Sequence, residues 1–86
     1  MQPLTSLAKG QHGTIMEIKA APEERSRLLE LGLTPGTTVE LVRFAPLGDP
    51  VELKVRGSHL SVNRPEADLI LVQAAASSAT GTAPRP

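Results

Sequence analysis

The sequence is marked first by the residue types that it lacks. It has no Cys, no Trp and no Tyr, and Phe44 is its only Phe. Without Cys the chain has no disulfide framework, no thiolate zinc site and no thiol nucleophile. With one aromatic ring it lacks the stacking platforms of single-strand nucleic-acid binders and the aromatic-lined groove that docks proline-rich peptides. We therefore expect packing alone, or a partner, to stabilise the domain, and we expect no binding to proline-rich peptides.

The sequence also lacks a charge surplus and a long apolar run. Lys and Arg number 9 and Asp and Glu number 9, so the formal net charge is zero. This balance argues against nucleic acid as a partner, because neutralising phosphates needs a basic surplus. No apolar run approaches the ~20 residues of a membrane span, and no secretion signal opens the chain. We expect a cytoplasmic chain without direct membrane insertion, which a partner recruits to the inner face of the membrane.

The composition changes near the C-terminus. Residues 74–86 (AAASSATGTAPRP) contain no Leu, Ile, Val or Phe. A segment that cannot bury apolar surface cannot offset the entropy cost of ordering it. We therefore predict one folded domain over residues 1–73, followed by a disordered Ala/Ser/Thr/Pro tail over residues 74–86.

Short apolar segments bounded by Gly or Pro dominate the predicted domain. Five of them are predicted strands, over residues 14–18, 38–44, 51–55, 58–63 and 68–72. A helix is predicted over residues 22–31, because Pro22 suits the first helical position and Gly32 the left-handed residue that ends a helix. The fold class is therefore mainly β, a small β-barrel with one α-helix inserted after the first strand.

The predicted helix should have an apolar and a charged face. We expect Leu28 and Leu31 to face the core, and Leu33 to fold back onto Leu28. Glu23 and Arg27 are four residues apart, in the favourable order for an ion pair on the exposed face.

Two residues, Arg56 and Gly57, separate the third and fourth predicted strands, which is a typical hairpin length. A turn there sets one register for both strands. The residues that it places on the inner face are Val51, Leu53, Val55, Leu60 and Val62. Those on the outer face are Glu52, Lys54, His59 and Ser61.

Other apolar residues fall out of phase with the residues expected to point inward. The out-of-phase residues are Val42, Phe44, Leu69 and Leu71, and the inward residues are Val39, Leu41, Ile70 and Val72. Either the helix with Leu4 and Leu7 covers this second face, or another protein does. Leu47 is a separate case, because it stands in a loop of Pro, Gly and Asp. We expect it to be exposed and to face a partner.

Four parts of the chain, in order, carry a family resemblance. They are residues 7–10 with 13–15, residues 28–36 (LLELGLTPG), residues 45–50 (APLGDP) and residues 61–72 (SVNRPEADLILV). Together they resemble the ferrous iron transport protein A family (FeoA-like domains). The resemblance implies an SH3-like β-barrel with an accessory role beside a membrane ferrous iron transporter that has a cytoplasmic G domain (FeoB-like). One departure is Asn63, where family members often place a basic residue before Arg64.

We accordingly predict a small regulatory protein of ferrous iron import that binds the cytoplasmic part of this transporter. It would bias a conformation of the G domain or help to assemble the transporter. The candidate partner-binding residues are Leu47, Pro46, Asp49, Phe44, Arg64 and Leu71. Similar domains are found at the C-terminus of metal-dependent transcriptional repressors. The alternative is therefore a regulatory module associated with such a repressor. A weak divalent-metal-binding protein is a third reading.

The candidate metal ligands are few. The hairpin register puts Glu52 diagonal to His59 on the outer face, and His12 is a further candidate. A closed zinc site takes four ligands. Fe2+ or Zn2+ would therefore bind at the surface, and a second copy would supply the remaining ligands in a metal-mediated homodimer. The other interpretation is that both histidines are solvated surface residues. No cofactor is required in either case.

No catalytic residue is predicted. Neither histidine lies in a recognisable nucleophile motif, and there is no Walker-type phosphate-binding loop. We therefore expect that the chain is not an enzyme.

Overall fold

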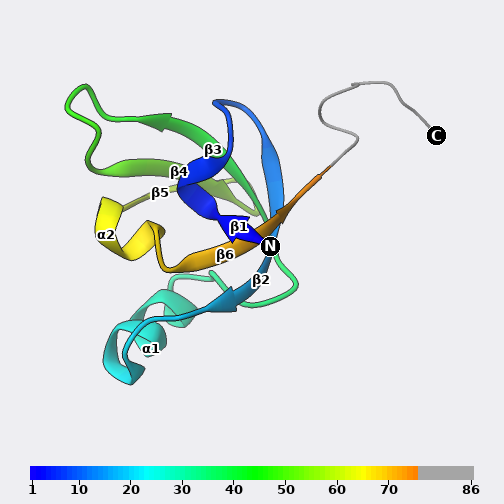
Figure 1. Ribbon diagram of the computed structural model, residues 1–86, viewed down its shortest axis with the longest axis vertical. Coiled ribbons are helices and arrows are strands. Elements are labelled where there is room, and N and C mark those ends of the chain that lie inside the picture. The colour runs from blue at the N-terminus through cyan, green and yellow to red at the C-terminus, as the bar shows by residue number, and fades with distance from the viewer. Residues whose placement is uncertain (76–86) are drawn as a thin grey trace.

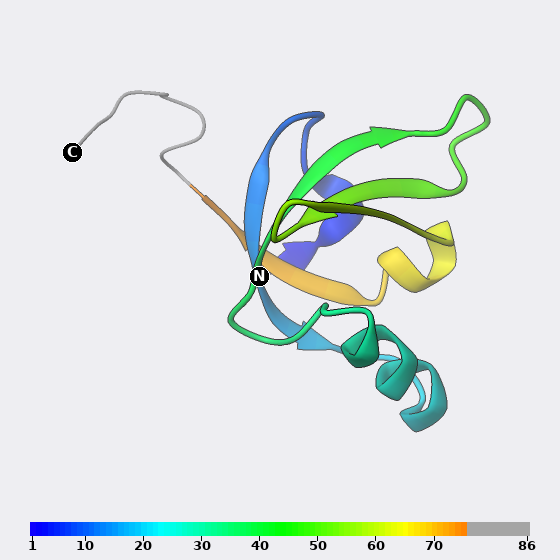
Figure 2. The same cartoon turned by 180° about the vertical axis from the view of Figure 1, so that it is seen from behind.

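The computed structural model describes residues 1–75 as a mainly β domain (Figures 1 and 2). The strands are β1 (Gln2–Pro3), β2 (His12–Ile18), β3 (Thr38–Phe44), β4 (Val51–Val55), β5 (Ser58–Val62) and β6 (Ile70–Ala74). The helices are the 3-10 helix η1 (Leu4–Ser6), α1 (Pro22–Glu30) and α2 (Arg64–Ala67). Within these residues no helix has the length and apolar character needed to cross a membrane.

The strands form one antiparallel sheet in the order β1-β6-β2-β3-β4-β5. The sheet curls on itself, and α1 follows β2 (Figure 1). The edge strands β1 and β5 do not pair with each other among the described residues. On that open side η1 contacts α2, and Thr5 Oγ1 donates a hydrogen bond to Asp68 Oδ1 over 2.5 Å. This is the predicted SH3-like barrel with a helix after the first long strand.

The core lies inside the curl and draws on every strand except β1. It includes the four predicted inward residues and both N-terminal leucines. Of the residues predicted to be out of phase, Val42, Leu69 and Leu71 are half-buried. The buried apolar residues are Leu4, Leu7, Ile15, Ile18, Leu28, Leu33, Val39, Leu41, Val51, Leu53, Val55, Val62, Ala67, Ile70 and Val72.

The β4–β5 hairpin has the predicted register. Leu53 lies opposite Leu60, and Lys54 lies opposite His59. The turn places Arg56 at a φ of +53° and Gly57 at +83°, so both residues take the left-handed conformation of a type I′ turn. Of the five apolar side chains on the inner face, only Leu60, in the edge strand, remains half-buried.

A β-bulge in β3 overturns one expectation. Between Leu41 and Arg43 the register shifts, so Val42 is an extra residue in this strand. Phe44 therefore lies opposite the buried Val51 and packs against the core. The prediction that Phe44 lies out of phase with the inward residues is wrong, because one inserted residue moves every later side chain to the other face.

Helix α1 ends as predicted, but one of its leucines does not lie as expected. Gly32 has a φ of +99°, and the Leu33 N–H donates to the Leu28 carbonyl over 3.1 Å, which is the hydrogen bond of a Schellman close. Leu28 and Leu33 are fully buried, whereas Leu31 is 42% exposed. The expectation that Leu31 faces the core is therefore wrong: α1 ends at Glu30, Leu31 is its C-cap residue, and the buried leucine after the helix is Leu33.

Helix α2 was not predicted. Asn63 is the residue before the helix and Pro65 is its second residue, a combination typical of helix starts. Because α2 occupies residues 64–67, the last strand begins at Ile70 rather than at residue 68. It continues through Ala74, one residue past the predicted end of the domain. Residues 76–86 of the predicted disordered tail lie outside the described residues.

Candidate partner-binding surface

The loop at residues 45–50 joins β3 to β4 and is fixed by its own backbone. The Ala45 N–H donates to the Pro50 carbonyl over 2.9 Å, and the Gly48 N–H donates to the Ala45 carbonyl over 2.6 Å. Gly48 has a φ of +89°, a conformation that Gly adopts at little cost. The loop therefore has a defined shape although it protrudes from the barrel (Figure 2).

Arg64, the first residue of α2, joins this loop to the end of β3. Its backbone N–H donates to Asp49 Oδ1 over 2.9 Å, which satisfies one of the free N–H groups at the start of α2. Its guanidinium lies over the Phe44 ring, with Cζ 5.1 Å from the ring centroid, in cation–π geometry. A Cβ on Gly48 would lie 3.3 Å from Arg64 Nη1, so the same guanidinium also touches the loop.

Leu47 is 96% exposed at the tip of this loop, as predicted. The structure thus gathers five of the six predicted partner-binding residues at one corner of the barrel. We call this the corner surface, and it consists of Phe44, Pro46, Leu47, Asp49 and Arg64.

Leu71, the sixth predicted residue, lies elsewhere. It is in β6, opposite Pro3 of β1 on one side and Glu17 of β2 on the other. Its side chain is half-buried. The sheet order separates β6 from β3 by β2, so Leu71 is not part of the corner surface.

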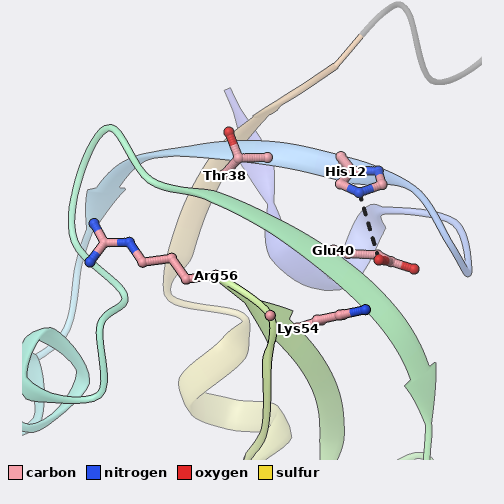
Figure 3. Close-up of a pocket in the computed structure, with 6 residues that line it drawn as sticks. His12, Thr38, Glu40, Lys54 and Arg56 are labelled. Carbon is pink, nitrogen blue, oxygen red and sulfur yellow. Dashed lines mark ion pairs between the residues drawn. The ribbon is translucent and has the colours of Figure 1, made fainter.

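A second surface feature is a shallow hollow of about 230 Å³ on the outer face of the sheet (Figure 3). We call it the polar hollow, and its lining residues are His12, Thr38, Glu40, Lys54, Arg56 and Gly57. His12 Nε2 lies 3.6 Å from Glu40 Oε1. Lys54 and Arg56 extend in opposite directions (Figure 3), and Arg56 Nη2 donates to Thr37 Oγ1 over 3.4 Å.

The three candidate metal ligands do not form one cluster among the described residues. His12 is in β2 and His59 in β5, three strand spacings or about 14 Å apart along the sheet. Glu52 lies opposite Ser61, as predicted, but its carboxylate pairs with Arg43 Nη2 at 3.1 Å. Within residues 1–75 no group of three or more acidic or histidine side chains is placed to hold a metal ion. Metal binding at the surface or between two copies stays a prediction.

Helix α2 carries a buried carboxylate that no local pattern in the sequence indicates. Glu66 is only 7% exposed, and its carboxylate forms an ion pair with Arg27 of α1. Arg27 was expected to pair with Glu23 of its own helix, and that expectation is wrong because Glu66 takes the guanidinium. Asn63 and Pro65 could have revealed α2, but nothing local could have revealed its partner.

The curled sheet, the inserted helix and the ordered corner define a small SH3-like barrel domain. Residues 2–74 match the FeoA domain, and the chain therefore belongs to the FeoA domain family.

Two relatives show how close the match is. The chain is 33% identical over 79 residues to the Fe(2+) transport protein A/Fe(2+) transporter FeoB fusion protein of Porphyromonas gingivalis (strain ATCC BAA-308 / W83), spanning 92% of this chain but only 9% of that protein. The solution NMR structure of the FeoA protein from Chlorobium tepidum superposes with a TM-score of 0.83 at 38% identity, covering 88% of this chain and 72% of that one.

A more distant likeness is to a manganese-dependent transcriptional repressor in complex with manganese. The TM-score is 0.79 at 17% identity, covering 86% of this chain and 36% of the repressor. At this identity the likeness shows a shared fold only.

Proposed function

We propose that the protein is an accessory component of ferrous iron import that binds the cytoplasmic part of the membrane ferrous iron transporter through the corner surface. The observation that carries this proposal is Leu47, an apolar side chain 96% exposed on a loop that hydrogen bonds hold in shape.

An exposed leucine on an ordered loop is suited to binding. Burying a Leu side chain is worth about 1.5–3 kcal/mol. A loop that is ordered before binding loses little conformational entropy when a partner covers it. Arg64 adds a cationic group beside the loop: its guanidinium lies over Phe44, and its backbone N–H donates to Asp49. A cation there suits an acidic residue at the rim of an apolar pocket.

The identity of the partner is supported by the fusion protein of P. gingivalis. Its name joins an Fe(2+) transport protein A and the transporter FeoB in one chain. A covalent link holds two modules at a high effective concentration, so it favours modules that act together. We infer that the same two modules associate when they are separate chains.

The mechanism that fits this chain is positional. Its described residues offer a binding surface, and we propose no reaction catalysed by them. A module that binds one conformation of the transporter more tightly than another shifts the transporter toward that conformation. We place the protein on the cytoplasmic side of the membrane, where it is recruited by its partner.

Capture from membranes tests the proposal directly. The tagged full chain is incubated with detergent-solubilised membranes of the cell that makes it, with and without ferrous iron and guanine nucleotide. We expect recovery of the transporter, and dependence on the nucleotide would indicate preference for one G-domain state. Recovery of a metal-dependent repressor in its place would favour the alternative function.

Leu47→Asp identifies the surface. We expect this variant to lose about 10- to 100-fold in affinity for the transporter, the equivalent of one buried leucine. Its thermal unfolding should match the wild type, because Leu47 makes almost no contact within the domain. Leu47→Met keeps an apolar side chain and should keep most of the binding. Equal capture by the Asp and Met variants would exclude Leu47 as a contact.

A further inference from the structure

β5 is the last strand in the sheet order, and no strand of the described residues pairs with its far side. The closing pair of a two-residue hairpin is hydrogen-bonded, and such pairs then alternate along the strands. The closing pair is Val55 and Ser58, and Leu53 with Leu60 is the next hydrogen-bonded pair. The backbone N–H and C=O groups of His59 and Ser61 therefore point away from β4, and both residues are exposed.

Within β5 itself the residues and irregularities that usually prevent pairing with another strand are missing. Proteins protect an edge with Lys, Pro or a β-bulge. β5 (SHLSV) contains neither residue type, and its register with β4 runs without a shift. The opposite edge, β1, is only two residues long and includes Pro3, which has no N–H to donate.

We propose that two copies of this chain associate by antiparallel pairing of their β5 edges about a two-fold axis at Leu60. In this register His59 of one copy lies opposite Ser61 of the other, and the two residues exchange both backbone hydrogen bonds. The same exchange occurs on the other side of the axis. Leu60 lies opposite Leu60 of the second copy on the inner face, which covers the one half-buried apolar residue of the hairpin.

The charges on the outer face favour this register and this occupant. Each cross-strand row then runs from Lys54 through His59 to Ser61 and Glu52 of the second copy, so a cation begins the row and a carboxylate ends it. A register centred on His59 would set two histidines opposite each other beside two Lys54 side chains. A register centred on Ser61 would need the Asn63 carbonyl, which already accepts the Ala67 N–H over 2.9 Å.

The proposed dimer is independent of the proposed function, because its contacts use no residue of the corner surface. It also needs no metal. The two proposals can therefore fail separately, and a dimer that forms only with added divalent metal would overturn the strand-pairing proposal.

Sedimentation of the full chain, in EDTA and over a wide concentration range, tests the association. We expect the average mass to rise toward twice the monomer mass of 9.1 kDa. Ser61→Pro removes an N–H that points away from β4, so it should weaken association at least about tenfold while the monomer stays folded. Ser61→Ala keeps this N–H and should associate like the wild type. Equal association by the Pro variant would overturn the proposal.

Cross-linking tests the register, because the chain has no Cys of its own. In the proposed register the two Leu60 residues face each other in a non-hydrogen-bonded pair. Such residues have Cα atoms about 4.5 Å apart, within the range of a disulfide. Leu60→Cys should therefore form a disulfide-linked dimer under mild oxidation. His59→Cys, which is also exposed, is the control, because diagonal residues lie about 7–8 Å apart and should link poorly.

Two further outcomes would contradict the proposal, one against the register and one against the occupant. Cross-linking of the His59→Cys variant as fast as the Leu60→Cys variant would exclude the register. A chain that stays monomeric at every concentration, but whose capture of the transporter is lost in Ser61→Pro, would assign the edge to a strand of the transporter and overturn the dimer.

Discussion

The corner surface and the polar hollow are both exposed, but they are built in different ways. The corner surface joins a loop to a helix start that follows it by some fifteen residues, through the bond from the Arg64 N–H to Asp49. The polar hollow consists mostly of cross-strand neighbours, such as His12 opposite Glu40 and Glu40 opposite Lys54. One surface is a product of tertiary structure, and the other is one face of a sheet.

The two surfaces also differ in what they expose. The hollow exposes polar and charged groups, which water solvates well, so the free protein loses nothing by leaving them uncovered. The corner exposes Leu47, which would be more stable covered. The contrast teaches that an apolar group held outward by ordered structure is better evidence for a partner than a group of titratable side chains on a sheet.

The largest expected effect on stability comes from comparing two ion pairs. Arg27 pairs with Glu66 on the α2 side, and Arg43 pairs with Glu52 on the sheet. Arg27 and Arg43 have similarly exposed side chains, at 52% and 50%, but the side chain of Glu66 is 9% exposed and that of Glu52 is 31% exposed. Arg27→Ala leaves a buried carboxylate without its cation, and should lower the free energy of unfolding by about 2 kcal/mol. Arg43→Ala should cost at most about 1 kcal/mol.

Urea unfolding of the two variants measures this difference. Removing both members of each pair completes a double-mutant cycle, which isolates the coupling energy from the other contacts of each arginine. Equal losses in the two arginine variants would mean that burial of Glu66 does not strengthen its dependence on Arg27, and that the α2 side is no more tightly built than the sheet face.

Two glycines provide the next comparison. Gly48 of the loop and Gly57 of the hairpin have similar φ values, +89° and +83°, so a Gly→Ala change costs each about 1–2 kcal/mol of backbone strain. Only at Gly48 does the new Cβ meet another group, since Arg64 Nη1 would be 3.3 Å away while nothing lies within 4 Å at Gly57. Gly48→Ala should therefore also displace the Arg64 guanidinium from Phe44.

The readout is transporter capture alongside thermal stability. We expect both variants to lose similar stability, and only Gly48→Ala to capture the transporter more weakly. This result would show that the shape of the corner surface matters for binding. If Gly57→Ala weakened capture as strongly, the effect would follow stability rather than the corner surface.

Local patterns in the sequence predicted much of this structure. The alternation on both sides of Arg56 and Gly57 fixed a single hairpin register, and the Gly and Pro neighbours of Leu47 indicated its exposure. Both inferences use residues close together in the chain, so no knowledge of the sheet order was needed.

The remaining features depend on contacts between distant residues. The bulge at Val42 has no local signal, so the face of Phe44 was predicted wrongly. The pairing of Arg27 with Glu66 depends on how α1 and α2 meet. The candidate ligands His12 and His59 could not be placed, because only the sheet order puts their strands apart.

The smallest expected effects belong to the polar hollow. Lys54→Ala and His12→Ala each remove an exposed side chain from a solvated face, and should change the free energy of unfolding by no more than about 0.5 kcal/mol. Neither should change transporter capture, because neither residue lies on the corner surface. A loss of capture in Lys54→Ala as large as in Leu47→Asp would reverse the comparison. It would show that the partner recognises the charged sheet face, and that the exposure of Leu47 alone does not mark the binding surface.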